Sequence, residues 1–296
     1  MTKKILSFNK AYQLKETALT IGFFDGIHLG HQELIKEVVN SKYVPAVLTF
    51  STDLKSIIQH KKEQLILTES EKEGLLSSLG IQQYYVLPFS KEVMSCSPSD
   101  FLNFLTNLNA KEIVVGSDFT FGKNAAGKAD LLNELKNRNI KIVIKDLLEV
   151  NNEKVSSTTI KNYLRLGQIE KANSLLGYHF FYESEVVKGL QNGRKLGYPT
   201  ANMNQSDEKI NLPDGVYKTQ TEIDGKTYPS MTNIGTHPTI DQLDKGIIET
   251  NVIGFDGNLY GKTIKVSFLS FLREQVKYKS LEELKNQLRI DKDNCR

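Results

Sequence analysis

The chain has 296 residues, of which 39% are hydrophobic and 25% are charged, and its formal net charge is +3 at pH 7. These proportions are typical of a folded protein with two domains of ordinary size, and so small a charge does not indicate a general nucleic-acid binder. Two cysteines (Cys96 and Cys295) are too few for a disulfide framework. The sequence contains neither a run of roughly 20 apolar residues nor an apolar targeting segment. We therefore expect a cytoplasmic protein without membrane or nucleic-acid partners.

Up to about residue 177, short apolar runs alternate with helical patterns. Alternation at this spacing predicts parallel strands joined by crossover helices, that is, an α/β doubly wound parallel sheet. Thr68 with Glu71 predicts a capping box, and Ser97 before Pro98 predicts a second helix start. The expected strands are 18–24, 44–50, 83–89, 112–116 and 141–147, and the expected helices are 31–39, 68–80, 97–108 and 129–137. Residues 156–177 predict two short helices that bridge the halves.

From about residue 178 the pattern becomes strand-like, which predicts a mostly antiparallel β-barrel or sandwich. The expected strands are 180–189, 215–224, 226–235, 247–255 and 262–272. Asp-Gly pairs at 224–225 and 256–257 predict hairpin turns. Ser280 and Glu283 predict the capping box of a C-terminal helix. We therefore place one domain at 1–177 and a second at 178–296.

The stretch GFFDGIHLGH, from Gly22 to His31, contains two of the five histidines of the chain. Glycines here permit a tight turn after a strand, and the following helix N-terminus suits a phosphate because its N–H groups are free. His28 and His31, three residues apart, face one pocket and can donate hydrogen bonds to phosphate oxygens during phosphoryl or nucleotidyl transfer.

Three other interpretations of these glycine-rich stretches are weaker. A zinc site lacks an evident third ligand, because the other histidines are scattered and the cysteines are distant. A purely structural role for both histidines fits poorly with the glycines around them. The stretch GKNAAGKA at 122–129 nearly matches a phosphate-binding P-loop, but Ala129 stands where the magnesium-binding hydroxyl belongs.

A second glycine-rich motif, GRKLGYPTAN, occupies 193–202. Its glycines permit close backbone approach, and its basic residues can contact phosphate. Thr200 and Asn202 offer oxygen atoms to Mg²⁺. The alternative is a polar turn between strands. The phosphate-binding candidates in this motif are Gly193, Arg194, Lys195 and Gly197.

The first motif, read as G-x-F-D-G-x-H-x-G-H, resembles the signature of the HxGH nucleotidyltransferases, in the form found in bacterial bifunctional riboflavin kinase/FMN adenylyltransferases (FAD synthetases). The stretches 114–127 and 154–167 resemble the same family. Residues 193–202 are similar to the riboflavin kinase signature, and later blocks of that family follow in order at 212–217, 233–239, 248–261 and 268–274. The resemblance implies ATP, riboflavin, FMN and FAD as substrates and products, with Mg²⁺ delivered together with ATP.

For the first half, the resemblance implies that ATP phosphates lie near His28, His31, Ser157 and Thr158. Lys161 stands where the family usually has arginine, which keeps the charge but loses the planar guanidinium. Asp118 and Phe121 are the implied flavin-side residues. The remaining implied nucleotide-binding residues are Gly22, Phe24, Asp25, Gly26 and Gly30.

For the second half, the resemblance implies that Thr200 and Asn202 hold Mg²⁺–ATP. Glu249 would be the general base that accepts the proton of the ribityl 5′-hydroxyl. Arg273 would contact the flavin or support the barrel.

Two departures from the family keep alternatives open. Ser51, Thr52 and Asp53 stand where the family usually has a Pro-His-Pro stretch, and Leu190 and Asn192 replace more polar or basic residues. The alternatives are a paralogue with one of the two activities, a flavin-binding regulatory protein, and another nucleotidyltransferase, although the last leaves the 193–202 motif unexplained. The oligomeric state is not predicted.

Overall fold

The structure is a computed structural model that describes residues 1–51, 64–189, 198–236 and 246–296. The chain divides into two compact units, residues 1–157 and 158–296, which we describe separately. The predicted division at residue 177 stays a prediction.

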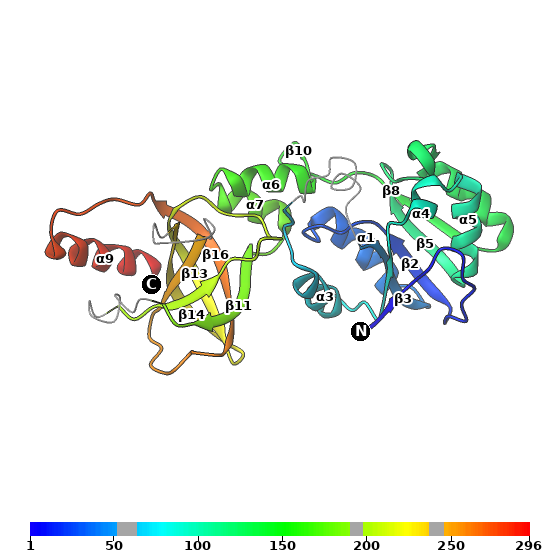
Figure 1. Ribbon diagram of the computed structural model, residues 1–296. Helices are drawn as coiled ribbons and strands as arrows, with labels where there is room; N and C mark the ends of the chain where they lie inside the picture. Colours follow the sequence, from blue (N-terminus) through cyan, green and yellow to red (C-terminus); the bar gives the residue numbers. More distant parts are fainter. Residues whose placement is uncertain (52–63, 190–197, 237–245) are drawn as a thin grey trace. The chain divides into compact units, whose positions relative to one another are not determined.

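The first unit is built on a six-stranded, fully parallel sheet with the order β1-β4-β3-β2-β5-β8. The central strand β2 is buried at every position, which explains its continuous apolar sequence. The order reverses between the neighbours β2 and β5 (Figure 1), and ligands of such sheets bind at the carboxyl ends of the strands at this point. The strands are β1 (Thr2–Ile5), β2 (Thr17–Ile21), β3 (Val44–Phe50), β4 (Gln83–Leu87), β5 (Ala110–Gly116) and β8 (Lys141–Lys145).

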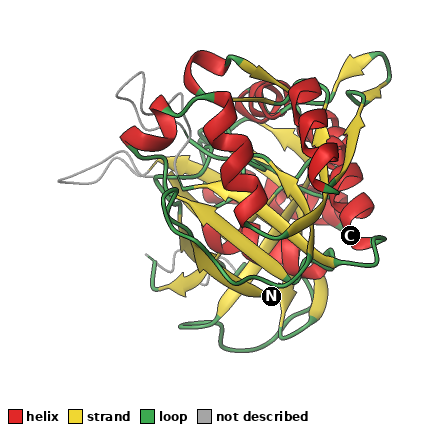
Figure 2. Ribbon diagram, turned by 90° about the vertical axis from the view of Figure 1, so that its right-hand side faces the viewer, coloured by secondary structure: helices red, strands yellow, loops and turns green. Residues whose placement is uncertain are grey.

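Helices cover both faces of this sheet (Figure 2, helices red). Ile113 and Val115 of β5 join the core beneath α5 and η2, whereas Val114, which alternates with them, is buried on the other face. The helices of this unit are α1 (Leu29–Val39), α3 (Glu69–Ser78), α4 (Lys91–Ser95), α5 (Pro98–Asn107) and the 3₁₀ segments η1 (Lys123–Ala125) and η2 (Ala129–Arg138). The short strands are β6 (Thr120–Phe121), β7 (Gly127–Lys128), β9 (Glu149–Val150) and β10 (Glu153–Lys154).

The predicted doubly wound sheet is confirmed, and so are both helix starts. Thr68 and Ser97 each form a complete capping box, and Pro98 occupies the first turn. The expected helix over 129–137 is a 3₁₀ helix instead. The strand β1 was not predicted, because this edge strand is exposed along its length and carries two lysines.

The second unit is a closed antiparallel barrel with the order β11-β12-β15-β14-β13-β16, which confirms the predicted barrel. Tyr182, Tyr217 and Phe268 fill its interior, where the Phe268 ring meets each tyrosine ring edge to face. The strands are β11 (Phe181–Val187), β12 (Ala201–Asn204), β13 (Gly215–Ile223), β14 (Lys226–Thr236), β15 (Gly246–Val252) and β16 (Thr263–Arg273). The helices are α6 (Ser157–Arg165, beginning at the last residue of the first unit), α7 (Ile169–Leu176) and α9 (Leu281–Cys295).

A chain of hydroxyl groups also runs through the barrel interior, all of them fully buried. Thr219 Oγ1 lies 2.8 Å from the hydroxyls of both Ser230 and Thr232, and Thr232 Oγ1 lies 2.9 Å from that of Thr250. Thr221 Oγ1 donates to Ser230 Oγ at 2.8 Å. These hydroxyls connect three neighbouring strands, β13, β14 and β15.

One of the two predicted hairpins is wrong. Asp224 and Gly225, both with positive φ, join β13 to β14 in a tight hairpin as expected. The pair at 256–257 joins β15 to β16, which are not neighbours in the barrel, because β15 pairs with β12 and β14. The C-terminal capping box is half formed, since the Glu283 carboxylate accepts from the N–H of Lys279 rather than that of Ser280.

Candidate active sites

The turn after β2 has a constrained backbone. Phe24, Gly26 and Ile27 have φ angles of 55°, 83° and 38°, and positive φ is uncommon for the two that are not glycine. A Cβ on Gly26 would lie 2.8 Å from Ile66 Cδ1, and the φ of 83° would strain any other residue at this position. The side chains of Phe24 and Ile27 are fully buried. The turn is therefore held in one shape at the carboxyl end of the central strand.

His28 and His31 meet at the start of α1, as predicted. Their rings stack with centroids 3.7 Å apart and planes at 14°. His28 is the N-cap, and its Nδ1 accepts the N–H of His31 at 3.4 Å. Because Nδ1 is the acceptor, the neutral ring carries its proton on Nε2, which can donate to a ligand.

Both histidines are neutral near pH 7. Burial lowers the pKa of His28 to about 4, although its backbone hydrogen bond and the charge of Asp118 act in the opposite direction. Burial also lowers the pKa of His31 well below its usual range, assisted by His28 and by the charge of Lys72. The site thus offers neutral N–H donors beside a helix N-terminus, an arrangement suited to phosphate oxygens.

The lowered pKa of His28 predicts that this unit loses stability in acid. The unfolded chain binds a proton near pH 6.5 and the folded chain near pH 4, so stability should fall as pH drops through this interval, by about 3 kcal/mol from His28. Urea unfolding followed by circular dichroism from pH 7 to 4 measures the slope. His28→Asn keeps an N-cap acceptor but does not titrate, so it should flatten the slope relative to the wild type. Equal slopes for the two proteins would contradict the assignment.

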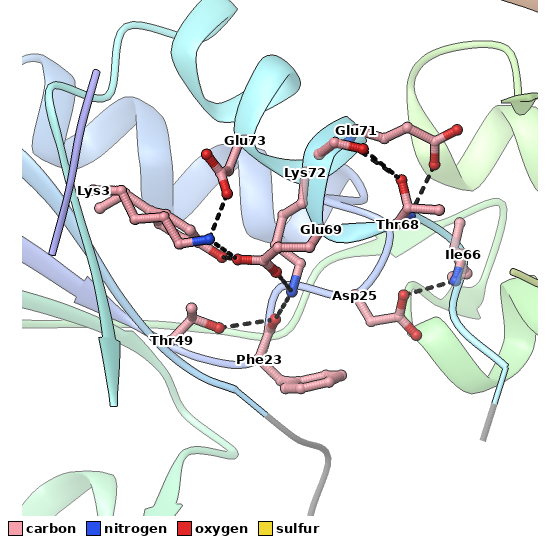
Figure 3. Close-up of polar contacts among 12 residues, drawn as sticks. Lys3, Phe23, Asp25, Thr49, Ile66, Thr68, Glu69, Glu71, Lys72 and Glu73 are labelled. Atoms are coloured by element: carbon pink, nitrogen blue, oxygen red, sulfur yellow. Dashed lines mark hydrogen bonds and ion pairs between the residues drawn. The ribbon is translucent and has the colours of Figure 1, made fainter. Parts of the chain in front are cut away.

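Asp25 anchors this turn, and two more predicted residues, Ser157 and Asp118, lie near it. Asp25 Oδ1 accepts the buried N–H of Ile66 at 2.8 Å (Figure 3), and the carbonyl of Asp25 accepts the Ser157 hydroxyl at 2.8 Å. Asp118 follows β5, the strand beside β2. It lies close enough to His28 for its negative charge to act against the lowering of the His28 pKa. Asp118 also pairs with Lys154 at 3.5 Å. Residues distant in sequence therefore converge at the point where the strand order reverses.

The other glycines of the motif also have defined places. The N–H of Gly22 donates to the carbonyl of Leu48 at 3.1 Å. Gly30 lies against the His28 ring, which would be 3.4 Å from a Cβ at this position.

On α6, Thr158 is exposed and Lys161 is buried.

Phe121 is packed in the core of the first unit, and its expected role on the flavin side stays a prediction. It is 6% exposed, its ring lies 5.1 Å from that of Phe101, and it packs so closely on Gly127 that a Cβ there would lie 2.7 Å away. Its ring belongs to the core. The stretch 122–129 contains the connection between β6 and β7 and the strand β7 itself, which pairs with β6 in a short hairpin. This hairpin differs from a P-loop, in which a glycine-rich loop leads from a strand to a helix.

Sequence reasoning missed Lys72 of α3. This lysine is 3% exposed, and its Nζ donates to the carbonyl of Phe23 at 3.2 Å, directly before the constrained turn. A signal was present, because Lys72 and buried Leu76 are spaced i and i+4 and so share the inward face of the helix. A charged residue on such a face is rarely fully buried without a partner.

The second unit brings two predicted residues together on the outer face of the barrel. Asn202 of β12 lies directly opposite Glu249 of β15, which in turn lies opposite Asn233 of β14. Thr200 directly precedes β12, and its carbonyl accepts a hydrogen bond from Asn202 Nδ2. Asn251 Nδ2 donates to the Pro199 carbonyl at 2.8 Å and fixes the approach to Thr200. Glu249 is half-buried.

The residues around Asn202 fit a magnesium ion. Asn202 Nδ2 donates to the Thr200 carbonyl at 3.5 Å, which leaves Oδ1 as the atom for a cation. A Cβ on Gly189 would lie 2.5 Å from the Asn202 side chain, so the glycine makes room for this amide. A hydroxyl and an amide oxygen are the hard donors that Mg²⁺ accepts beside substrate phosphates. Gly193, Arg194, Lys195 and Gly197 lie outside the described residues, as do Thr52, Asp53, Leu190 and Asn192.

Arg273 has a supporting contact. Its Nε lies 3.1 Å from both carboxylate oxygens of Asp291 on α9, and one terminal nitrogen donates to Asp291 at 2.7 Å. Asp291 is 2% exposed and also accepts from Gln287. Of the two roles expected for Arg273, these contacts favour support of the barrel.

Comparisons with known proteins agree with both halves of the chain. The FAD synthetase family matches residues 10–159, and the riboflavin kinase family matches residues 176–296. The chain is 32% identical over 289 residues to the bifunctional riboflavin kinase/FMN adenylyltransferase of Bacillus subtilis, covering 95% of this chain and 92% of that protein. It is 31% identical over 285 residues to the protein of the same description from Listeria monocytogenes, covering 94% and 91%.

A solved structure shares the fold along the whole chain. It is described as a macrolide-efflux protein from Streptococcus pneumoniae, and it matches with a TM-score of 0.89 and 29% identity, covering 100% of this chain and 99% of that one. In the part of the chain that the structure describes, no helix is both long and apolar enough to span a bilayer.

Proposed function

The chain belongs to the family of bifunctional riboflavin kinases/FMN adenylyltransferases, and we propose that each unit performs one of the two reactions. The barrel phosphorylates riboflavin to FMN, and the parallel-sheet unit adenylylates FMN to FAD. The observation that carries the proposal is that each unit brings together one pair of the expected catalytic or metal-binding residues. His28 stacks on His31, and Asn202 lies beside Glu249.

In the kinase reaction, Glu249 accepts the proton of the ribityl 5′-hydroxyl as its oxygen bonds to the γ-phosphorus of ATP and the bond to ADP breaks. Thr200 Oγ1 and Asn202 Oδ1 would hold Mg²⁺, which when bound neutralises phosphate charge. The register places Asn202 opposite Glu249, so the base and the triphosphate are oriented by neighbouring strands.

In the adenylylation reaction, a phosphate oxygen of FMN attacks the α-phosphorus of ATP, and the bond to pyrophosphate breaks. No protein nucleophile is required. Neutral His28 and His31 donate N–H groups to the phosphate oxygens on which charge accumulates, and the N-terminus of α1 adds its dipole. Asp118 lies near His28 and is available to the nucleotide or the flavin.

We also place the protein in the cytoplasm. Burial raises the pKa of the Cys295 thiol to about 11 and also raises that of Cys96, so both remain protonated thiols. Both cysteines are free in the structure, which suits a reducing compartment.

Two incubations of the purified protein test the proposal. Riboflavin with Mg²⁺ and ATP should yield FMN, and FMN with Mg²⁺ and ATP should yield FAD and pyrophosphate, all separated by chromatography. Product in only one incubation would support a paralogue with a single activity. Flavin binding without product in either would instead support a regulatory protein.

A further inference from the structure

Lys72 is a lysine in an unusual position. Its side chain is 3% exposed, although lysine is among the residues least often buried. Burial lowers the pKa of Lys72, while the carboxylates of Glu69 and Asp25 act against this and favour the ammonium form. Removing a charge from water costs free energy, so the contacts of a buried ammonium group must offset the lost hydration.

The contacts of Lys72 converge on one peptide group (Figure 3). Its Nζ donates to the carbonyl of Phe23 at 3.2 Å and lies 4.8 Å from the centre of the Phe23 ring. Thr49 Oγ1 donates to the same carbonyl at 3.2 Å. Donors from α3 and β3 thus fix the orientation of the Phe23–Phe24 peptide.

That peptide begins the turn that carries the histidines. Phe24 is the first residue with positive φ, and His28 caps α1 four residues later. A positive φ at a phenylalanine persists only where its surroundings hold it. A hydrogen-bond donor to the Phe23 carbonyl, which directly precedes Phe24, can therefore determine the path of the backbone through the turn.

Lys72 also acts on the histidines through its charge. Its positive charge helps to lower the pKa of His31, together with burial and His28. The charged groups around Lys72 are Glu69, whose Oε2 is 3.7 Å from Nζ, Asp25 and Lys3. Lys3 reaches the same cluster from β1 through Glu69 and Glu73, but its side chain is 37% exposed.

We propose that Lys72 is a positioning residue for adenylyl transfer: its ammonium group holds the Phe23 carbonyl and, through it, the turn that presents His28 and His31. The inference rests on the proposed role of the two histidines. It assigns Lys72 no contact with substrate. Its loss should therefore lower the rate of the chemical step more than the affinity for ATP, because small displacements of donors aimed at a transition state cost rate.

Three variants of the full chain test the proposal. Lys72→Met removes both the donor and the charge, Thr49→Val removes only the other donor to the Phe23 carbonyl, and Lys3→Met removes the exposed lysine of the same cluster as a control. We expect kcat for FAD formation from FMN to fall roughly 10–100-fold in Lys72→Met and roughly 3–10-fold in Thr49→Val, with KM for ATP changed less than about threefold. Lys3→Met should match the wild type.

A second measurement separates positioning from general destabilisation. Histidine titration by NMR should show a higher pKa for His31 in Lys72→Met and an unchanged one in Thr49→Val, because only the former loses a charge. Folding of each variant is checked by circular dichroism. A folded Lys72→Met protein with kcat within threefold of the wild type overturns the proposal. If Lys72→Met does not fold, an unchanged kcat in Thr49→Val overturns it.

The wild-type chain and His31→Ala distinguish this failure from failure of the proposed function. If His31→Ala makes FAD as fast as the wild type, the site assignment itself is wrong. If His31→Ala is impaired and Lys72→Met is not, only the role of Lys72 is refuted.

Discussion

Replacing Glu249 with glutamine should lower riboflavin phosphorylation by about 10²–10⁴-fold and leave FMN adenylylation unchanged. Glutamine has nearly the shape of glutamate but cannot accept the proton of the attacking hydroxyl. The position also matters, because Glu249 lies opposite Asn202 on the neighbouring strand, where the triphosphate is expected. Initial rates of FMN formation from riboflavin and of FAD formation from FMN, measured on the same preparation, give both numbers.

Glu222→Gln is the matched control for this experiment. Glu222 lies on β13 of the same barrel and is exposed, so its loss of charge should change neither activity. Full kinase activity in Glu249→Gln would remove this residue from the reaction. An equal loss in both variants would point to the charge of the barrel rather than to a base.

His31→Ala should lower FAD formation from FMN by about 10²–10³-fold while FMN formation from riboflavin continues at the wild-type rate. The substitution removes a neutral donor from the helix N-terminus and also the ring that stacks on His28. Kinase activity of the same chain serves as an internal control. Exposed His179→Ala should change neither rate.

His28→Asn extends the test to the second ring. If both rings stabilise one transition state, the double substitution should cost much less than the product of the two single effects. A single substitution at either histidine that abolished both activities would contradict two independent sites.

Local signals in the sequence predicted most of the fold. The capping box at Thr68 and the N-cap at Ser97 before Pro98 marked helix starts, because these signals involve residues at most three apart. The strand β1 and the course of the chain after Gly257 were not predictable in this way. The former is an exposed edge, and the latter depends on which strands are neighbours in the closed barrel.

The candidate sites show the same division between local and distant information. The His28–His31 pair follows from helical spacing, and Thr200 and Asn202 come from one short motif. That Glu249 lies beside Asn202 depends on the strand register, which no local pattern of the sequence specifies. The packing of Phe121 against Phe101 and Gly127 joins residues distant in sequence, so no local pattern indicated that its ring is buried.

The buried hydroxyls of the barrel have a consequence for phosphoryl transfer. Thr250 belongs to this hydroxyl chain and adjoins Glu249, whose side chain lies on the opposite face of β15. Sliding β15 by one residue would move Thr250 out to solvent, leave the buried Thr232 hydroxyl without this contact, and turn the carboxylate of Glu249 inward. These hydrogen bonds do not involve a substrate, but they oppose a register shift of β15. They thereby keep the carboxylate of Glu249, the expected proton acceptor, on the outer face of the barrel.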